Sequence, residues 1–456
     1  MTIGFGTAAY SIVAAVKLAS KSKLKLRLFR WTKKIMDQHY GMALLVQNLY
    51  VDRYPLLYKP PIFIREWKGR LHLVGVKRPL DWIQTRFPLF ILLCILVACA
   101  WAISIVAPSS PRPAMDVRIW AWWFVIVLAI CGSEVYYLWL VKGRETSVFW
   151  GNEMLQLEMD LKRATQECRH AHINIHTPLD AFILFGLKVF VWIGYLFTPV
   201  GTFICMILGF DPQSYVLSYL MTSWPMISIL LRTLTFHSEP LLTVVILSGR
   251  FVTMTVALYE GERLLIIVLG SIYIIIYTAA TVVGLLGKLV IINRRRIQIG
   301  LFHRHIRVYT MLILAVHAVE DIVNMTLSIV ILATTVVLVT ITFVSVRLGH
   351  LLPGYLVLII VSAGIFGFLL AKTLLTKTAS IFKNVVELLE AFKGVEIVGG
   401  MRRGVRLGYL RDVRRFDVLK IPIGVGSTVF TTVDKNTNVR LSRLFVEVSV
   451  NALILF

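Results

Sequence analysis

Residues 262–292 read ERLLIIVLGSIYIIIYTAATVVGLLGKLVII, and the triplet Arg294-Arg295-Arg296 follows them almost directly. A run of about 20 mostly apolar residues is long enough to cross the hydrocarbon core of a bilayer as a helix. Basic residues next to a span are retained on the cytoplasmic side of the membrane. This stretch therefore predicts both a transmembrane helix and its direction.

The rest of the chain has a similar composition. Of its 456 residues, 57% are hydrophobic and 16% are charged, whereas soluble domains average about 45–50% and about 25%. The Lys and Arg residues behind the net charge of +23 lie between long apolar blocks. A nucleic-acid-binding protein would carry a continuous basic face or a recognisable reading module. The composition therefore predicts a membrane protein surrounded by lipid, with no nucleic-acid partner.

Seven apolar blocks predict transmembrane helices. The six clear spans are residues 88–107, 118–141, 180–209, 262–292, 322–346 and 353–374. The seventh, 438–456, has Arg440 and Arg443 near its start, and arginines at the inner end of a span can snorkel to the interface. The expected fold class is therefore all-α, a polytopic membrane protein with seven transmembrane helices.

Two further apolar segments, 216–235 and 241–259, are ambiguous. Pro225 interrupts the first and Arg250 lies midway along the second. An unpaired arginine at the bilayer centre costs a few kcal/mol. We expect both segments to be helices of an extracellular loop, with nine spans as the alternative.

The distribution of basic residues orients the chain in the membrane. With the N-terminus in the cytoplasm, the inner segments hold 37 of the 48 Lys and Arg residues and the outer loops hold 4. The expected parts are a cytoplasmic basic N-terminal segment (1–87), a six-helix bundle (88–374), a cytoplasmic anchor segment (375–437) and a seventh helix (438–456) that ends outside the cell.

Several functional classes do not fit this sequence. G-protein-coupled receptors have the opposite topology, and no Asp-Arg-Tyr-like triplet follows the third span. The histidines at 170, 172 and 176 match no zinc spacing, and no P-loop, GxSxG or HExxH motif occurs. The sequence therefore indicates no enzyme and no cofactor or metal. A secondary transporter of a small solute stays as the alternative, although the internal repeat common in transporters is not apparent.

The last span carries the residues of a family resemblance. Gustatory receptors have Thr-Tyr, five hydrophobic positions and Gln-Phe there, and residues 444–452 of this chain read LFVEVSVNA. Phe445 stands in place of the Tyr and Asn451 in place of the Gln, whereas Leu444 and Ala452 depart from the pattern. Together with the inverted seven-span topology, this stretch resembles the insect-type chemoreceptor superfamily of gustatory and odorant receptors, as a divergent gustatory-receptor-like member.

The resemblance implies a function and an assembly. It implies a ligand-gated, non-selective cation channel in the plasma membrane that acts as a taste-type chemosensory receptor for a small molecule. It also implies a homo- or heterotetramer in which the seventh helix of each subunit lines a central pore. Segment 375–437 would then belong to an intracellular anchor. The expected partners are a small-molecule ligand, cations and membrane lipid.

Helical spacing selects candidate pore residues in the last span. One face carries Leu444, Val448, Asn451 and Leu455, with Glu447 beside it. Hydrophobic constrictions gate pores and acidic rings favour cations. We therefore predict pore or gate roles for Phe445, Glu447, Val448, Asn451, Ala452 and Leu455. The alternative is a packed span in which Asn451 bonds a neighbour and Glu447 is paired or protonated.

Two ionisable residues lie inside the predicted spans at similar depth. Glu134 in the second span and Lys188 in the third are each about 10–12 Å from the inner end, at about 1.5 Å per residue. Ionisable groups inside a membrane are costly and usually partnered. We predict a structural ion pair between them, with separate contacts to water or the interface as the alternative.

Aromatic residues in the spans are candidates for ligand binding. The resemblance implies a small-molecule cavity in the outer half of the bundle, and such cavities are mostly apolar. The candidates are Trp123, Tyr195, Tyr273 and Tyr277. Tyr273 and Tyr277 are favoured because they lie four residues apart on one helical face. Each aromatic residue can equally serve in packing or in an interfacial belt.

Overall fold

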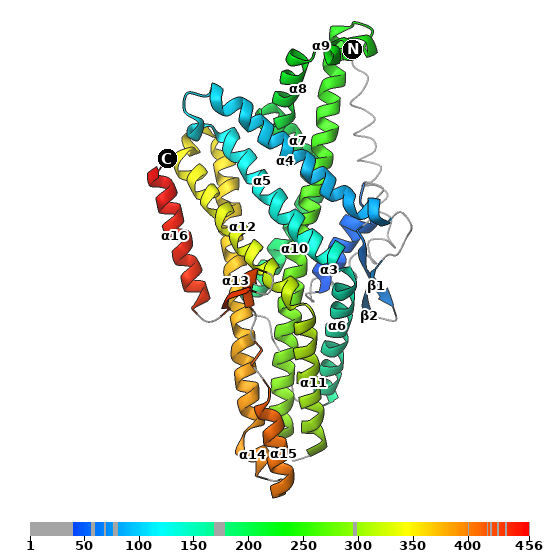
Figure 1. Cartoon of the computed structure of the whole chain (residues 1–456), viewed down its shortest axis with the longest axis vertical. Helices are drawn as coiled ribbons and strands as arrows, with labels where there is room; N and C mark the ends of the chain where they lie inside the picture. The colour runs from blue at the N-terminus through cyan, green and yellow to red at the C-terminus, as the bar shows by residue number, and fades with distance from the viewer. Residues whose placement is uncertain are drawn as a thin grey trace, which may run out of the picture.

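The computed structural model describes residues 40–55, 60–67, 70–75, 81–167, 178–294, 299–399, 401–416, 418–419, 422–425, 428–433 and 436–455. Residues 1–39 of the basic N-terminal segment and the histidine-containing segment 168–177 lie outside these ranges. Figure 1 shows an elongated bundle of long helices. The predicted fold class, an all-α polytopic membrane protein, is confirmed.

The long helices follow one another with short connections. A short helix α3 (Tyr40–Gln47), its π-helical extension η1 (Asn48–Asp52) and a hairpin of β1 (Ile62–Trp67) and β2 (Arg70–Gly75) come first. The next helices are α4 (Asp81–Ser109), η2 (Pro113–Met115), α5 (Val117–Tyr136), η3 (Tyr137–Lys142), α6 (Arg144–Glu167), α7 (Pro178–Ile207), α8 (Pro212–Ser223), α9 (Pro225–Leu234) and α10 (Glu239–Arg294). The chain continues with α11 (Ile299–Ala318), α12 (Glu320–Arg347), η4 (Gly349–Leu351), α13 (Gly354–Phe392), α14 (Val395–Val398), α15 (Arg403–Arg414), β3 (Pro422–Val425), β4 (Thr428–Thr432) and α16 (Thr437–Leu455).

Six helical stretches in the described part of the chain are long and apolar enough to cross a membrane. They are Thr85–Ser109, Val117–Lys142, Ala181–Ile207, Glu239–Ile291, Glu320–Arg347 and Gly354–Phe392, one for each clear span of the sequence analysis. The pair α8 and α9, bent by 104°, would add a seventh if it were one span. Helix α16 is not in this set because Arg440, Arg443 and Glu447 lie within it. Its crossing, and the side of the membrane on which each segment lies, stay predictions.

Segment 241–259 is helical, as expected, but it does not form a helix of its own. This segment continues without a break into the fourth span, giving a single helix α10 of 56 residues. At about 1.5 Å per residue, α10 is about 84 Å long. Two antiparallel crossings are excluded here, and with them the nine-span alternative. Arg250 does not break the helix because its Nε lies 2.7 Å from Oδ2 of the buried Asp211, at the start of α8.

The helix of the sixth span extends beyond the predicted span. The predicted span 353–374 and the first part of the expected anchor segment belong to one helix, α13, of 39 residues, and the place where this helix leaves the membrane stays a prediction. Likewise, the first long helix begins at Asp81 rather than after Pro88, which lies inside α4. Pro88 lacks an N–H and removes one backbone hydrogen bond there, but the helix continues on both sides of it.

Helix α10 organises two apolar cores. Its upper part packs with α4 and α5, and its lower part packs with α6, α11 and α13 (Figure 1). We call α6, α11, α14, α15 and the lower halves of α10 and α13 the lower bundle. Helices α6 and α11 lie between the predicted spans, so this bundle was not expected from the apolar blocks alone.

A β-hairpin precedes the last helix, inside the segment that was expected to be an Arg-rich anchor. Strands β3 and β4 are antiparallel, and β3 packs against α12, where the Ser328 hydroxyl donates to the Gly424 carbonyl oxygen at 2.6 Å. A Cβ at Gly424 would lie 1.9 Å from the carbonyl oxygen of Thr428. Glycine is therefore required for the two strands to approach each other.

Candidate pore helix and ligand-binding region

One face of α16 packs against the rest of the chain, on α12 and α13. The ring of Phe445 lies 6.0 Å from that of Phe368, and Ser449 is buried. Ala452 packs against an apolar cluster around Phe343 and Val344. Two of the six predicted pore residues, Phe445 and Ala452, therefore lie on the packed face of the helix.

The other four predicted pore residues lie on the sides of α16 that do not pack. Glu447, Val448, Asn451 and Leu455 are all exposed in the single chain. Leu444, on the same helical row, is exposed as well. The row selected by helical spacing is thus free to meet water, lipid or another subunit. A pore role for these residues stays a prediction.

Glu447 has a partner that the sequence analysis did not name. Its Oε1 lies 2.7 Å from Nε of Arg443, one helical turn earlier, and both side chains are more than half exposed. The i, i+4 spacing of opposite charges could have revealed this pair in the sequence. In an assembly of several α16 helices, each acidic group would therefore have a basic group beside it.

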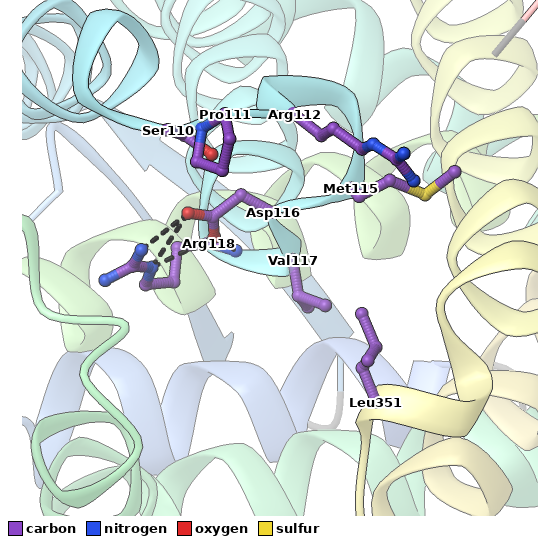
Figure 2. Close-up of a pocket in the computed structure, with 8 residues that line it drawn as sticks. All are labelled: Ser110, Pro111, Arg112, Met115, Asp116, Val117, Arg118 and Leu351. Carbon is purple, nitrogen blue, oxygen red and sulfur yellow. Dashed lines mark hydrogen bonds and ion pairs between the residues drawn. The ribbon is translucent and has the colours of Figure 1, made fainter.

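A pocket lies at the connection between α4 and α5 (Figure 2). It has a volume of about 440 Å³ and is lined by Ser110, Pro111, Arg112, Met115, Asp116, Val117, Arg118 and Leu351. We call it the outer pocket. Its residues come from the α4–α5 connection, the first turn of α5 and η4.

Asp116 and Arg118 form an ion pair in the wall of the outer pocket, which also contains a third charged residue, Arg112. The Asp116 carboxylate accepts the backbone N–H of Arg118 and caps α5, and its Oδ2 lies 2.5 Å from Nη2 of Arg118. This guanidinium holds the pKa of Asp116 below its usual value. Arg118 also donates from Nη1 to the Tyr215 hydroxyl at 2.6 Å. The wall of the pocket is thereby tied to α8.

The outer pocket is connected by direct contacts to the end of α16. Met115 and Val117 in its wall pack on the cluster that contains Trp120 and Phe343. The rings of Trp120 and Phe343 lie 4.5 Å apart, and the same cluster includes Ala452 and Leu453 of α16. Nη2 of Arg347 also donates to the Leu453 carbonyl oxygen at 3.2 Å. A change at the pocket therefore has a short path to α16.

The four aromatic residues predicted to bind a ligand lie in three separate places. Trp123 is exposed on α5, whereas Tyr273 and Tyr277 are fully buried with their rings stacked at 4.3 Å. Tyr195 contacts Tyr259, which precedes Tyr273 by fourteen residues of α10, about 21 Å. One small molecule could not touch all four. Ligand binding by any one of them stays a prediction.

Tyr195 belongs to a cluster of four tyrosines that joins η1 and the residues after it to α7 and α10. The other members are Tyr50, Tyr54 and Tyr259, with neighbouring ring centroids 5.8–6.5 Å apart. The Tyr195 hydroxyl donates to the Arg53 carbonyl oxygen at 2.7 Å. Tyr50 and Tyr54 were not among the predicted site residues because they lie in the expected cytoplasmic segment 1–87. Their aromatic i, i+4 spacing was the available signal.

A fully buried ion pair lies beside this cluster. Glu260 and Arg263 are one turn apart on α10, with Oε2 and Nη2 2.8 Å apart and both side chains at most 1% exposed. The Arg263 guanidinium carbon lies 4.5 Å from the ring centroid of Tyr54, whose hydroxyl donates to Glu260. These contacts offset the cost of burying two charges, and they attach the segment after α3 to the central helix.

Glu134 and Lys188 lie on helices with different neighbours. Helix α5 packs mainly against α4, α10 and α12, whereas α7 packs mainly against α3, α10 and α13. Glu134 is exposed on α5 and Lys188 is half-buried on α7. The ion pair between them stays a prediction.

Comparisons with known proteins were informative at the level of structure. No family model matches the sequence, and no curated protein matches it by sequence. The structure of the insect olfactory receptor OR5 from Machilis hrabei matches with a TM-score of 0.56 and 11% identity, covering 94% of this chain and 99% of the receptor. The structure of that receptor in complex with eugenol matches to the same extent. The chain therefore has the fold of an insect olfactory receptor, and the resemblance to the insect-type chemoreceptor superfamily is confirmed at the level of fold.

Proposed function

We propose that this chain is a chemosensory receptor of the taste type, a ligand-gated, non-selective cation channel opened by a small molecule. The observation that carries the proposal is the shared fold, which extends over 94% of this chain and nearly all of an olfactory receptor that has also been solved with eugenol bound. Because the match covers most of both chains, it supports the same arrangement of helices in the two proteins.

In this proposal four α16 helices surround the pore of a tetramer in the plasma membrane, with the N-terminus of each chain in the cytoplasm. The exposed side of α16 carries Glu447 and Asn451 beside Val448 and Leu455. Charged and amide groups are costly against lipid but stable against a water-filled channel. A face of this composition therefore favours a position at a pore over a position in the hydrocarbon. The resident partners would be cations in the pore and lipid around the bundle.

The proposed ligand site is the outer pocket. Its volume of about 440 Å³ falls in the usual range of small-molecule sites, about 300–1,000 Å³. The chain of contacts from Met115 through Trp120 and Phe343 to Leu453 offers a route by which an occupied pocket moves α16. Of the aromatic residues selected from the sequence, Tyr195 stays a second candidate because it is only half-buried.

The test is electrical recording from cells that express the full chain, screened with sugars, bitter compounds and volatile molecules. A channel gives ligand-evoked currents with resolvable unitary openings. Saturable solute uptake without openings would instead identify a secondary transporter and overturn the proposal.

The route from the outer pocket to α16 needs a separate pair of variants. Trp120→Ala removes a ring from that route and should raise the ligand concentration for half-maximal current at least tenfold. Trp192→Ala removes an exposed ring of α7 as the matched control and should leave that concentration unchanged. Equal behaviour of the two variants would rule out the proposed route.

A further inference from the structure

A second cavity lies where the spans meet the lower bundle, and it shares no lining residue with the outer pocket. Its volume is about 60 Å³, and its wall combines side chains of η3, α6, α10, α11, α12 and α13. Ile276 and Ala279 of α10 form one side, and Val316 and Val319 form another. The lining is almost entirely carbon, so the cavity interrupts an otherwise close-packed core.

Two irregular turns border this cavity. Trp139 belongs to the π-helical turn η3 that ends α5, and Val319 separates α11 from α12. A π-helical turn inserts an extra residue into a helix and is frequent at functional sites. Neighbouring side chains cannot follow regular helical packing at such turns, which accounts for a gap at this position.

The polar groups in the wall are nearly all engaged. The Thr326 hydroxyl accepts the Trp139 indole N–H at 2.8 Å, and the Thr378 hydroxyl donates to the Leu374 carbonyl oxygen at 2.9 Å. Glu320 lies 2.6 Å from Nδ1 of His317.

One polar group of the wall is left over. The indole N–H of Trp150 is buried without an acceptor in the described part of the chain. Buried water molecules usually make about three hydrogen bonds, and a wall that is almost entirely carbon presents little polar surface for them. The cavity therefore favours an apolar occupant over water.

We propose that this cavity is a binding site for small, neutral, apolar molecules. A single water molecule requires about 10–15 Å³ in the same measure, so about 60 Å³ accommodates a few such volumes and excludes larger ligands. Dry apolar cavities of this kind bind xenon and small hydrocarbons. The site is separate from the outer pocket, and its occupancy does not depend on the proposed channel function.

Xenon is the appropriate probe because it is apolar, small and lacks hydrogen-bonding groups. Its NMR chemical shift is measured against xenon pressure in micelles that contain the purified full chain. Ala279→Leu places a larger side chain in the cavity and should weaken the saturable component at least tenfold. Ile276→Ala enlarges the cavity and should strengthen that component. Val200→Leu, an exposed position on α7, is the matched control and should change nothing.

Two results would overturn the proposal. One is a shift that rises linearly with pressure and is the same for the native chain and for folded Ala279→Leu protein, since xenon would then only partition into the micelle. If Ala279→Leu does not fold, as judged by size-exclusion chromatography, the Ile276→Ala variant decides. Failure of this enlarged cavity to bind more xenon than the native chain would exclude the site, whether or not the chain conducts ions.

Discussion

Helices α10 and α16 each carry a pair of opposite charges within apolar sequence, but the pair is buried in α10 and exposed in α16. On α10, Glu260 and Arg263 are paired at 2.8 Å and fully buried among tyrosines. On α16, Arg443 and Glu447 are paired at 2.7 Å with both side chains more than half exposed. Nearly the same spacing thus produces a core contact in one helix and a surface pair in the other.

The difference teaches what each pair can contribute. A buried pair whose members satisfy each other is strongly coupled to folding, because removal of one partner leaves an uncompensated charge. An exposed pair is screened by solvent and contributes little to stability. The buried pair of α10 therefore acts on the stability of the fold. The exposed pair of α16 can act on ions in the pore that we propose.

The largest effect is expected from breaking the buried pair. Arg263→Ala leaves Glu260 buried without its counter-ion and should lower the free energy of unfolding by about 3–5 kcal/mol, measured by denaturation in micelles. The double variant Glu260→Leu/Arg263→Met removes both charges and should recover most of the loss. If the single and double variants are equally unstable, the charge pair is not the cause.

Substitution of Tyr54, the tyrosine beside the buried pair, should change the free energy of unfolding by a smaller amount. Tyr54→Phe keeps the ring over Arg263 but removes the hydroxyl that donates to Glu260. We expect a loss of about 1–3 kcal/mol in the free energy of unfolding, as for a buried acceptor at a charged group that loses its donor. Tyr219→Phe is the matched control, since Tyr219 is substantially exposed. Equal losses in both variants would contradict the role of the Tyr54 hydroxyl.

Acid should weaken the lower bundle through a buried histidine. Burial, with a contribution from Arg304, lowers the pKa of His305 on α11 to about 4. The unfolded chain takes up this proton near pH 6.5, so stability is complete above that pH and decreases as the pH falls from about 6.5 towards 4.

This pH dependence is checked by melting temperatures measured at intervals from pH 7.5 to pH 4.5. His305→Gln should flatten the decrease, whereas His350→Gln, at an exposed position in η4, should not. A native chain and a His305→Gln variant with the same pH slope would refute the assignment.

The smallest effect on stability is expected at the exposed pair, where the effect on conduction should be clear. Glu447→Gln removes an acidic group from the proposed pore and should reduce the preference for cations, while Arg443→Gln should increase it. Melting temperatures should barely change in either variant. Reversal potentials in mixed-ion solutions measure this preference for cations. If they are unchanged in both variants, these side chains of α16 do not line the conduction path.

The spans could be predicted from the sequence because an apolar run of sufficient length is a local property. The features that were not predicted depend on contacts between residues far apart in the sequence. Arg250 appeared to interrupt a span, but Asp211, at the start of α8, pairs with it. The tyrosine cluster brings Tyr50 and Tyr195 together from positions far apart in the chain.

Other features carried a local signal that the sequence analysis did not use. Alternating β-branched residues and glycines over 421–433 indicate the β3–β4 hairpin. The Arg443–Glu447 pair follows from its spacing. For the site, the exposed row of α16 was identifiable from helical periodicity, whereas the outer pocket was not, because its wall is assembled from two separate interhelical connections.

The unbroken length of α10 has a mechanical consequence. A helix of 56 residues is far longer than a bilayer is thick, and it has no proline-induced kink in its interior at which to bend. Bilayers that are thinner or thicker than the native one must then be accommodated by tilting the whole rod. A tilt at one end displaces the other end, some tens of ångströms away. Lipid thickness would thereby act on the upper core and the lower bundle together.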